Sequence, residues 1–165
     1  MLYARMGGQR AAARPVRGGT SAPERRLMDQ YGKNGNSVPS DARGKLRVLV
    51  VDDHHDSARA LSRLLTNCGY QAEMAHDVAS ALRVAADRPI DLLVSDISLP
   101  DGTGLDLIRT LRQAGPVKGI ALSGHSGPAA VKSSEDAGFS IHLAKPVDFD
   151  SLRQTLDKLA GVCRP

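Results

Sequence analysis

From residue 46 onward, short apolar runs alternate with segments in which apolar residues recur every three or four positions. Runs rich in Val, Leu and Ile and bounded by turn residues indicate buried strands, whereas the longer recurrence indicates amphipathic helices. The predicted strands cover residues 46–51, 71–75, 91–95, 118–122 and 140–144. The predicted helices cover residues 56–67, 77–87, 105–115, 128–137 and 148–159.

This regular alternation predicts the topology. Each connection between strands is long enough to hold a helix, so the strands are expected to be parallel. Right-handed crossovers leave few arrangements, and the strand order 2-1-3-4-5 is the simplest of them. We therefore predict an α/β fold, a flavodoxin-like doubly wound (βα)5 domain with a parallel five-stranded sheet.

Local signals support the helix boundaries. In the first predicted helix, Ala58, Leu61, Leu64 and Leu65 fall on one face and are predicted to be buried. Gly69 follows that helix as a stop signal. Asp77 stands where the N-cap of the second helix is expected.

Residues 1–44 differ in composition from the rest, being rich in Gly, Arg, Pro, Ser and Asn. We expect a disordered basic N-terminal extension there and one domain over residues 45–162. Residues 1–45 hold nine Lys and Arg against three Asp and Glu, a net charge of +6, whereas residues 46–165 hold 13 against 15, a net charge of −2. The extension has few aromatic residues, so its charge is only a weak signal for nucleic-acid binding.

Composition also indicates in which compartment the protein works. Hydrophobic residues make up 41% of the chain, but no apolar run approaches the roughly 20 residues of a membrane span. The start of the chain lacks the apolar core of a signal peptide. Cys68 and Cys163 have neither metal-site nor disulfide spacing. We therefore expect a cytoplasmic protein that makes no membrane contact.

Three carboxylates follow two strands that the predicted order makes neighbours. Asp52 and Asp53 end the run 46–51, and Asp96 ends the run 91–95. All three should meet at the carboxyl edge of the sheet, where α/β proteins bind ligands. Carboxylates in contact repel one another, and a hard divalent cation with oxygen ligands relieves that repulsion. The pattern predicts a Mg²⁺ site, to which the Ser98 backbone carbonyl could contribute.

Two further polar residues are expected at the same edge. Ser123 follows the strand 118–122, and Lys145 follows the strand 140–144. A lysine ammonium suits a phosphoryl oxygen, and a hydroxyl can donate a hydrogen bond to the same group. The chain has no Gly-rich phosphate loop, which argues against a bound nucleotide. A metal, a lysine and a hydroxyl around one carboxylate predict phosphoryl transfer onto Asp96.

Four sequence segments carry a family resemblance. VLVVDD at 48–53, LLVSDISLPDGTG at 92–104, ALSG at 121–124 and LAKPVD at 143–148 resemble the receiver domain of two-component response regulators, in order and spacing. The resemblance implies a signalling domain that promotes only its own phosphorylation and dephosphorylation. The residue roles it implies are Asp96 as phosphoacceptor, Asp52, Asp53, Asp96 and the Ser98 carbonyl as Mg²⁺ ligands, and Ser123 and Lys145 as contacts of the phosphoryl group. It also implies a cis bond at Lys145-Pro146.

The chain departs from the family pattern at two positions. His142 stands where the resemblance places an aromatic switch residue that moves together with Ser123, and Thr103 stands where an acid is common. Both departures affect the expected output surface rather than the phosphorylation chemistry. Gly124 fits either a need for space beside the phosphoryl group or a loop glycine with positive φ.

The remaining histidines have no ligand spacing typical of a transition-metal site. His54 and His55 are adjacent in sequence, so their side chains should point apart, and His76 and His125 are expected at the surface.

The resemblance implies as partners a histidine kinase or histidine phosphotransfer protein and a downstream protein target. The chain ends soon after the last predicted helix, so we expect no DNA-binding domain in it. A stand-alone receiver is the first hypothesis; a receiver detached from a hybrid sensor histidine kinase, which the segment AGF…LAKPVD resembles, is the second. A homodimer through residues 128–137, 140–144 and 148–159 is possible.

A phosphatase with an Asp nucleophile fits less well, because such enzymes have DxD rather than adjacent Asp residues and carry a cap domain.

Overall fold

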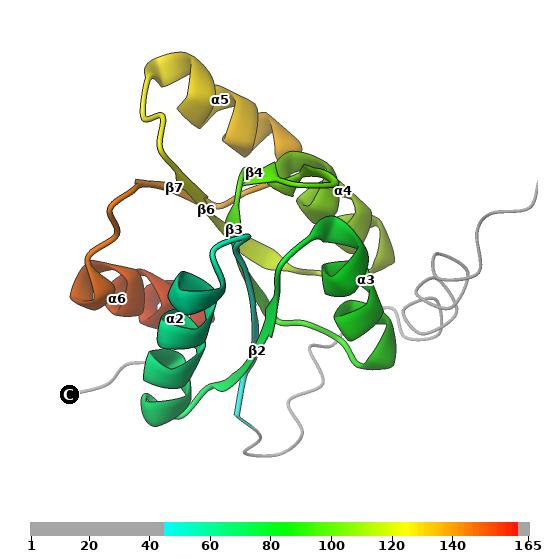
Figure 1. Cartoon of the computed structure of the whole chain (residues 1–165), viewed down its shortest axis with the longest axis vertical. Helices are drawn as coiled ribbons and strands as arrows, with labels where there is room; N and C mark the ends of the chain where they lie inside the picture. Colours follow the sequence, from blue (N-terminus) through cyan, green and yellow to red (C-terminus); the bar gives the residue numbers. More distant parts are fainter. Residues whose placement is uncertain (1–44, 162–165) are drawn as a thin grey trace, which may run out of the picture.

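The computed structural model describes residues 45–161 and contains one five-stranded sheet with every strand parallel to its neighbours (Figure 1). The strand order is β2-β1-β3-β6-β7. The strands are β1 (Arg47–Val51), β2 (Gln71–Ala75), β3 (Leu92–Asp96), β6 (Lys118–Ser123) and β7 (Ile141–Ala144). The labels β4 (Ser98–Leu99) and β5 (Gly102–Thr103) belong to a separate small hairpin. When the five strands of the sheet are numbered along the chain without them, the order is the predicted 2-1-3-4-5, so the predicted fold is confirmed.

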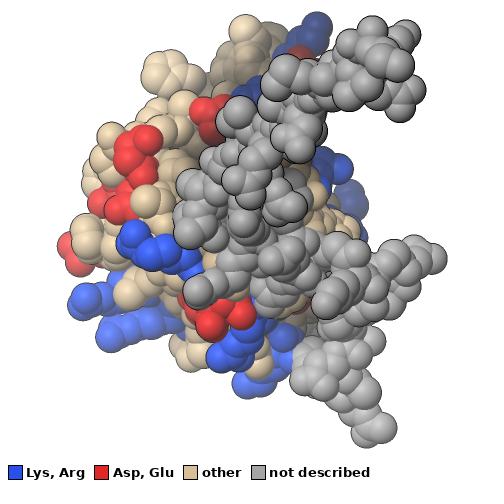
Figure 2. Space-filling model, turned by 90° about the vertical axis from the view of Figure 1, so that its right-hand side faces the viewer, with Lys and Arg blue, Asp and Glu red and all other residues tan. Residues whose placement is uncertain are grey.

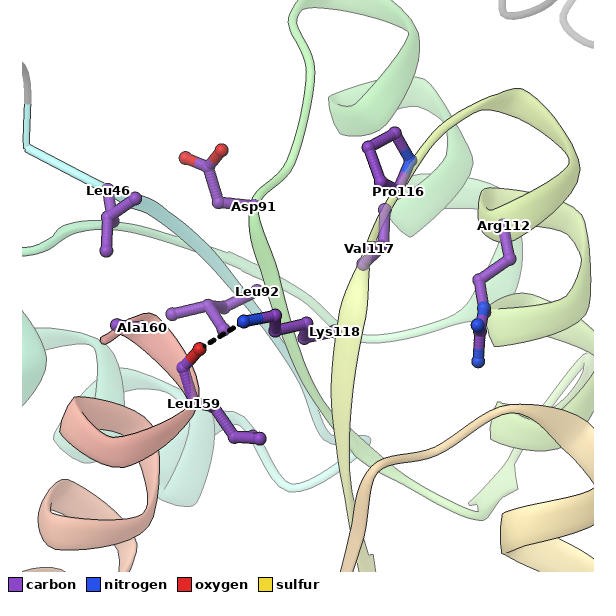
Figure 3. A pocket seen from close by; sticks show the side chains of 9 residues that line it. All are labelled: Leu46, Asp91, Leu92, Arg112, Pro116, Val117, Lys118, Leu159 and Ala160. Carbon is purple, nitrogen blue, oxygen red and sulfur yellow. Dashed lines mark hydrogen bonds between the residues drawn. The ribbon is translucent and has the colours of Figure 1, made fainter. Parts of the chain in front are cut away.

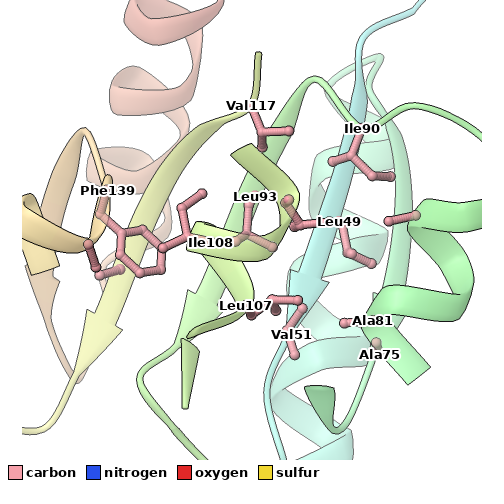
Figure 4. Packing of buried hydrophobic residues seen from close by; sticks show 14 of the residues in the cluster. Leu49, Val51, Ala75, Ala81, Ile90, Leu93, Leu107, Ile108, Val117 and Phe139 are labelled. Atoms are coloured by element: carbon pink, nitrogen blue, oxygen red, sulfur yellow. The ribbon is translucent and has the colours of Figure 1, made fainter. Parts of the chain in front are cut away.

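Helices cover both faces of the sheet. They are α2 (His55–Asn67), α3 (Val78–Asp87), α4 (Gly104–Ala114), α5 (Pro128–Ala137) and α6 (Phe149–Ala160). Successive strand side chains point to opposite faces, so Val48 and Val50 pack toward α2 and α6 while Leu49 and Val51 pack toward α3 and α4. Figure 4 shows the second of these cores, with Phe139 and Ile108 at one end and Ala81 at the other. This two-sided burial is why the strands read as continuous apolar runs.

A two-stranded antiparallel hairpin between β3 and α4 was not predicted. It consists of β4 (Ser98–Leu99) and β5 (Gly102–Thr103). Strands of two residues are too short to show any periodicity, so the pattern of apolar residues holds no signal for them.

The prediction that Leu64 is buried is wrong. Leu64 is 39% exposed, whereas Ala58 and Leu65 on the same helix are completely buried. At 3.6 residues per turn, Leu64 lies about 100° around the helix from Leu65 and about 120° from Ala58, so it sits at the flank of the buried stripe. Leu61 lies between these positions and is half-buried.

The helix boundary signals are confirmed. Gly69 after α2 has φ 90°, a left-handed conformation that favours glycine. Asp77 caps α3 by accepting a hydrogen bond from the Ser80 N–H at 2.6 Å. The Ser80 hydroxyl in turn accepts a hydrogen bond from the Asp77 N–H, which completes a capping box. The hydrogen bonds from Ser80 lower the pKa of Asp77. Asp148 likewise caps α6 through the Ser151 N–H at 2.8 Å.

Within residues 45–161, none of the helices combines the length and the apolar character required to cross a bilayer. The predicted extension over residues 1–44, residue 162 of the predicted domain and Cys163 lie outside the described residues. The described part of the face beside α3 and α4 carries acidic and basic side chains interspersed (Figure 2).

Candidate functional site

The predicted site residues lie on the carboxyl edge of the sheet. Asp52 directly follows β1 and Asp96 ends β3, and these strands are paired so that Val51 faces Ser95. Ser123 ends β6, and Lys145 directly follows β7. Strand pairing therefore brings together four residues that are far apart in sequence, as the fold prediction required.

Lys145 joins two buried carboxylates. Its Nζ donates to Asp52 Oδ2 at 2.8 Å and to Asp96 Oδ2 at 2.7 Å. Asp52 is 1% exposed and Asp96 is 9% exposed. Burial acts to lower the pKa of Lys145, but the hydrogen bonds and negative charges of Asp52 and Asp96 outweigh it, so the pKa is raised. The ammonium thus supplies positive charge where buried carboxylates need it.

The second oxygen of each carboxylate accepts a main-chain hydrogen bond. Asp52 Oδ1 accepts from the His54 N–H at 2.9 Å, and Asp96 Oδ1 accepts from the Ser98 N–H at 3.1 Å. Both bonds span two residues, the spacing of an Asx turn. They fix how the chain leaves β1 and β3, and so fix where Asp53 and the Ser98 main chain lie.

Asp53 and His54 form the outer part of the site. Asp53 Oδ1 lies 2.8 Å from His54 Nδ1, and ligand atoms of Asp52, Asp53 and His54 all lie within 4.8 Å of one another. The hydrogen bond to Asp53, with the charges of Asp53 and Asp52, raises the pKa of His54. The carboxylate oxygens of Asp52 and Asp53 are hard donors of the kind that suits Mg²⁺. The Mg²⁺ would counter the same negative charge that Lys145 counters on the inner side.

Ser123 holds the next loop. Its Oγ accepts a hydrogen bond from the His125 N–H at 3.0 Å. A hydroxyl that accepts still has its own proton to donate. Gly124 in the same loop does not have a positive φ, so the positive-φ explanation for this glycine is wrong, and an added Cβ would meet no atom within 4 Å.

A close backbone approach behind Asp96 explains Gly104. A Cβ at this position would lie 2.2 Å from the Asp96 carbonyl oxygen and 2.9 Å from Ser95 Oγ, which itself donates to that carbonyl at 2.7 Å. The Gly104 N–H donates to the Ile97 carbonyl at 2.8 Å. The local sequence gives no sign of this close approach, because the crowding atoms belong to Ser95 and Asp96 of β3.

His142, the predicted switch position, is half-buried and hydrogen-bonded at both ring nitrogens. Its Nδ1 lies 3.0 Å from Ser134 Oγ on α5, and its Nε2 lies 3.0 Å from the His125 carbonyl oxygen. A carbonyl only accepts, so Nε2 carries the proton that joins it to the loop beginning at Ser123. Phe139 is 4% exposed in the core and does not take this position.

Two contacts near the site were missed. His76, expected at the surface, is half-buried: its ring stacks on His55 with centroids 3.7 Å apart, and its Nδ1 is hydrogen-bonded to the Asp52 carbonyl at 3.0 Å. His125 is exposed, as expected. Asp101 accepts from the Val78 and Ala79 N–H groups at 2.7 and 2.9 Å, which ties the loop after β3 to the start of α3. Both contacts join different elements and leave no local sequence signal.

The peptide bond between Lys145 and Pro146 is cis, as the resemblance implies.

A hollow of about 340 Å³ lies at the opposite, amino-terminal edge of the sheet (Figure 3). It is lined mainly by aliphatic side chains, with Lys118 bonded to the Leu159 carbonyl at 2.6 Å. The carboxylate site is therefore separate from this hollow.

The fold and the site define a doubly wound α/β protein with a cluster of carboxylates at the carboxyl edge of its sheet. Residues 48–157 match the family model of the response regulator receiver domain. The chain therefore belongs to the response regulator receiver family.

Proteins of similar sequence include both regulators and kinases. The chain is 36% identical over 110 residues to the photosynthetic apparatus regulatory protein RegA of Rhodovulum sulfidophilum, covering 66% of this chain and 60% of that protein. It is 34% identical over 123 residues to the sensor histidine kinase RcsC of Salmonella typhi, covering 71% of this chain and 12% of that protein. The chain thus spans less than two thirds of the length of either relative.

Solved structures agree with the fold. The chemotaxis response regulator CheY4 of Vibrio cholerae is 27% identical, with a TM-score of 0.65 over 70% of this chain and 98% of that one. A response regulator of the LuxR family from Aurantimonas is 30% identical, with a TM-score of 0.65 over 72% of this chain and 87% of that one. Receiver domains are phosphoacceptor domains of phosphorelay signalling and are generally not enzymes; they bind Mg²⁺ at an acidic cluster and interact with histidine kinases or phosphotransfer proteins.

Proposed function

We propose that Asp96 accepts a phosphoryl group from a phosphohistidine of a partner histidine kinase or histidine phosphotransfer protein, in a Mg²⁺-dependent reaction. The observation that carries this proposal is the bridge from Lys145 to the carboxylates of Asp52 and Asp96. The bridge holds a cation against the acceptor oxygen at a sheet edge that also carries the acid pair and a hydroxyl.

In the transfer, an Asp96 carboxylate oxygen forms a bond to phosphorus while the bond from phosphorus to the histidine nitrogen breaks, and the departing imidazole takes up a proton. Bound Mg²⁺ would neutralise charge on the phosphoryl oxygens; Asp52, Asp53, Asp96 and the Ser98 carbonyl would hold it. Lys145 would move from the carboxylates to a phosphoryl oxygen. The Ser123 hydroxyl would donate a hydrogen bond to another phosphoryl oxygen.

The phosphoryl group would change the protein surface through the loop after β6. Ser123 would be drawn toward the phosphoryl group, and His142 is joined to the same loop by its bond to the His125 carbonyl. The loop, β7 and the flanking helices α5 and α6 would then present a changed surface to a downstream protein, or to a second copy in a homodimer. A stand-alone regulator is the form we favour. The match to a sensor histidine kinase supports a hybrid-kinase receiver as the second form.

The test is phosphorylation with acetyl phosphate and Mg²⁺, followed on a phosphate-affinity gel. We expect the wild type to shift and Asp96→Asn to remain unshifted, because the variant lacks the acceptor oxygen. Asp136→Asn, which removes an exposed carboxylate on α5, is the matched control and should shift like the wild type. A shift that survives in Asp96→Asn would refute the proposal.

A further inference from the structure

The residue after the acid pair places a nitrogen donor in the site. His54 Nδ1 lies 2.8 Å from Asp53 Oδ1 and 3.4 Å from Asp52 Oδ1. Ligand atoms about 2.0–2.2 Å from a Zn²⁺ ion lie about 3.0–3.5 Å apart in tetrahedral or octahedral sites. The two separations from Nδ1 are thus already close to those that one such ion requires, and all three donor atoms lie within 4.8 Å of one another.

The loop backbone prepares this arrangement. The His54 N–H donates to Asp52 Oδ1, which holds the His54 main chain beside the acid pair, and the ring reaches Asp53 Oδ1 through Nδ1. The His54 side chain is 74% exposed, and an ion can therefore reach Nδ1 from water without any movement of the core. His55 is not part of this cluster, and its ring stacks on His76.

The cluster is also separated from the lysine. Lys145 occupies Oδ2 of Asp52, while Oδ1 faces the histidine. A cation near Asp53 and His54 would therefore leave the bridge from Lys145 to Asp52 and Asp96 in place. The outer side of the site can take an ion that differs from the one expected between the three carboxylates.

Donor chemistry decides which ion that would be. Mg²⁺ prefers oxygen ligands, whereas an imidazole nitrogen favours borderline transition metals. Two carboxylates and one imidazole form a mixed set of the kind that Zn²⁺ accepts, with water completing the coordination.

We propose that Asp52, Asp53 and His54 form a mixed nitrogen–oxygen site that takes Zn²⁺ and, because Asp52 and Asp53 are shared, excludes Mg²⁺ while it is filled. Zinc then acts as an inhibitor of phosphorylation. This competition rests on the proposed function, whereas the binding of Zn²⁺ does not.

The test is isothermal titration calorimetry of the full chain with Zn²⁺ and, separately, with Mg²⁺. We expect the wild type to bind Zn²⁺ at least about tenfold more tightly than Mg²⁺. His54→Gln should lose about tenfold or more of the Zn²⁺ affinity while its Mg²⁺ affinity changes little, because Gln offers only an oxygen in place of Nδ1. His125→Gln, which removes an exposed imidazole of the neighbouring loop, should bind both ions like the wild type. Asp53→Asn should weaken both ions.

Two results would overturn the inference: Zn²⁺ affinity unchanged in His54→Gln, or an equal loss in His54→Gln and His125→Gln. If either occurs while Asp53→Asn still loses Mg²⁺, the proposed function stands and only the zinc site falls. If Asp53→Asn loses Zn²⁺ but keeps full Mg²⁺ affinity, the zinc site stands and the proposed Mg²⁺ ligands are wrong. Thermal melts with a chelator present should show all three variants folded.

Discussion

The Asp52 carboxylate serves two neighbours at once. One oxygen accepts from Lys145, and the other accepts from the His54 main chain. Because Asp52 is almost completely buried, each of these hydrogen bonds offsets part of the cost of removing a charge from water. As a consequence, Asp52 and Asp96 share the ammonium group of Lys145.

We predict that Lys145→Met destabilises the protein by roughly 1–3 kcal/mol, less than for a fully buried pair because the ammonium is partly exposed. The variant leaves two buried carboxylates without their cation. Added Mg²⁺ should therefore raise the Tm of Lys145→Met more than that of the wild type. Urea and thermal melts with and without Mg²⁺ measure both effects, and an equal response to Mg²⁺ would contradict the charge argument.

For His142, the structure adds contacts that the sequence does not show. The sequence places it at a switch position, and the structure shows it joining α5 to the loop after β6. We predict that ¹⁵N NMR finds the proton on Nε2 in the free protein, where the His125 carbonyl accepts it. With beryllofluoride bound at Asp96, the Nε2 signal should change as the loop moves. An unchanged signal would mean that His142 takes no part in the response.

At the scale of elements, the connection from β3 to α4 is limited by space. Gly104 lies against the Asp96 carbonyl, whereas Gly124, at the end of β6, has open space around the position of a Cβ. The two glycines therefore form a matched pair for the same substitution.

Gly104→Ala should cost about 1–3 kcal/mol of stability or more, because its Cβ overlaps a backbone atom that cannot move freely. Gly124→Ala should leave stability nearly unchanged and slow phosphorylation, since the methyl group points into the space expected for the phosphoryl group. Urea melts and acetyl phosphate labelling separate the two effects. Similar behaviour of the two variants would contradict this distinction.

The start of α3 depends on carboxylates. Asp77 caps the helix, and Asp101 from the loop after β3 accepts from its first N–H groups. This second contact connects the stability of α3 to the loop that carries Ser98.

The lowered pKa of Asp77 sets the sign of a pH effect. A carboxyl group whose pKa is lower in the folded state stabilises above its unfolded pKa, and the contribution is lost as the pH falls through the folded pKa. We predict that Asp77→Ala lowers the Tm at neutral pH and that its difference from the wild type shrinks as the pH falls below about 4. Asp77→Asn, which caps without a charge, should lie closer to the wild type than Asp77→Ala at every pH, while its difference from the wild type changes with pH in the same way, because neither variant titrates at this position. Melts across this range test the sign, and a difference that grows in acid would refute it.

At the scale of the whole molecule, the two cores on either side of the sheet consist of residues within 46–160. Every strand of the described sheet pairs with another strand of that sheet. We therefore propose that residues 45–162 form a self-sufficient domain.

A chain that begins at Lys45 should melt at nearly the same Tm as the full chain and be phosphorylated by acetyl phosphate at a similar rate. Differential scanning calorimetry and gel assays on both chains test this. A large loss of stability in the shorter chain would show that residues 1–44 contribute to the folded core.

Within residues 45–161, the sequence alone determined the five helices, the five strands of the main sheet, their order and the edge of the sheet where the candidate site residues lie. These features follow from local physics. Apolar periodicity separates helices from strands, Asp77 caps the start of one helix, and Gly69 ends another. Parallel strands bring their carboxyl ends to one edge of the sheet. Asp52, Asp96, Ser123 and Lys145 could be grouped in advance because each follows a recognisable strand. Their residue roles remain proposals that the experiments above test.

The tertiary structure alone decided which contacts these residues make. It showed Leu64 at the flank of its helix, Gly104 pressed against the Asp96 carbonyl, and His142 bonded to two elements. It also revealed the His54 ring hydrogen-bonded to Asp53. Each of these depends on the distance between atoms of different elements or on how a helix is rotated against the sheet, and no pattern within a single segment records either quantity.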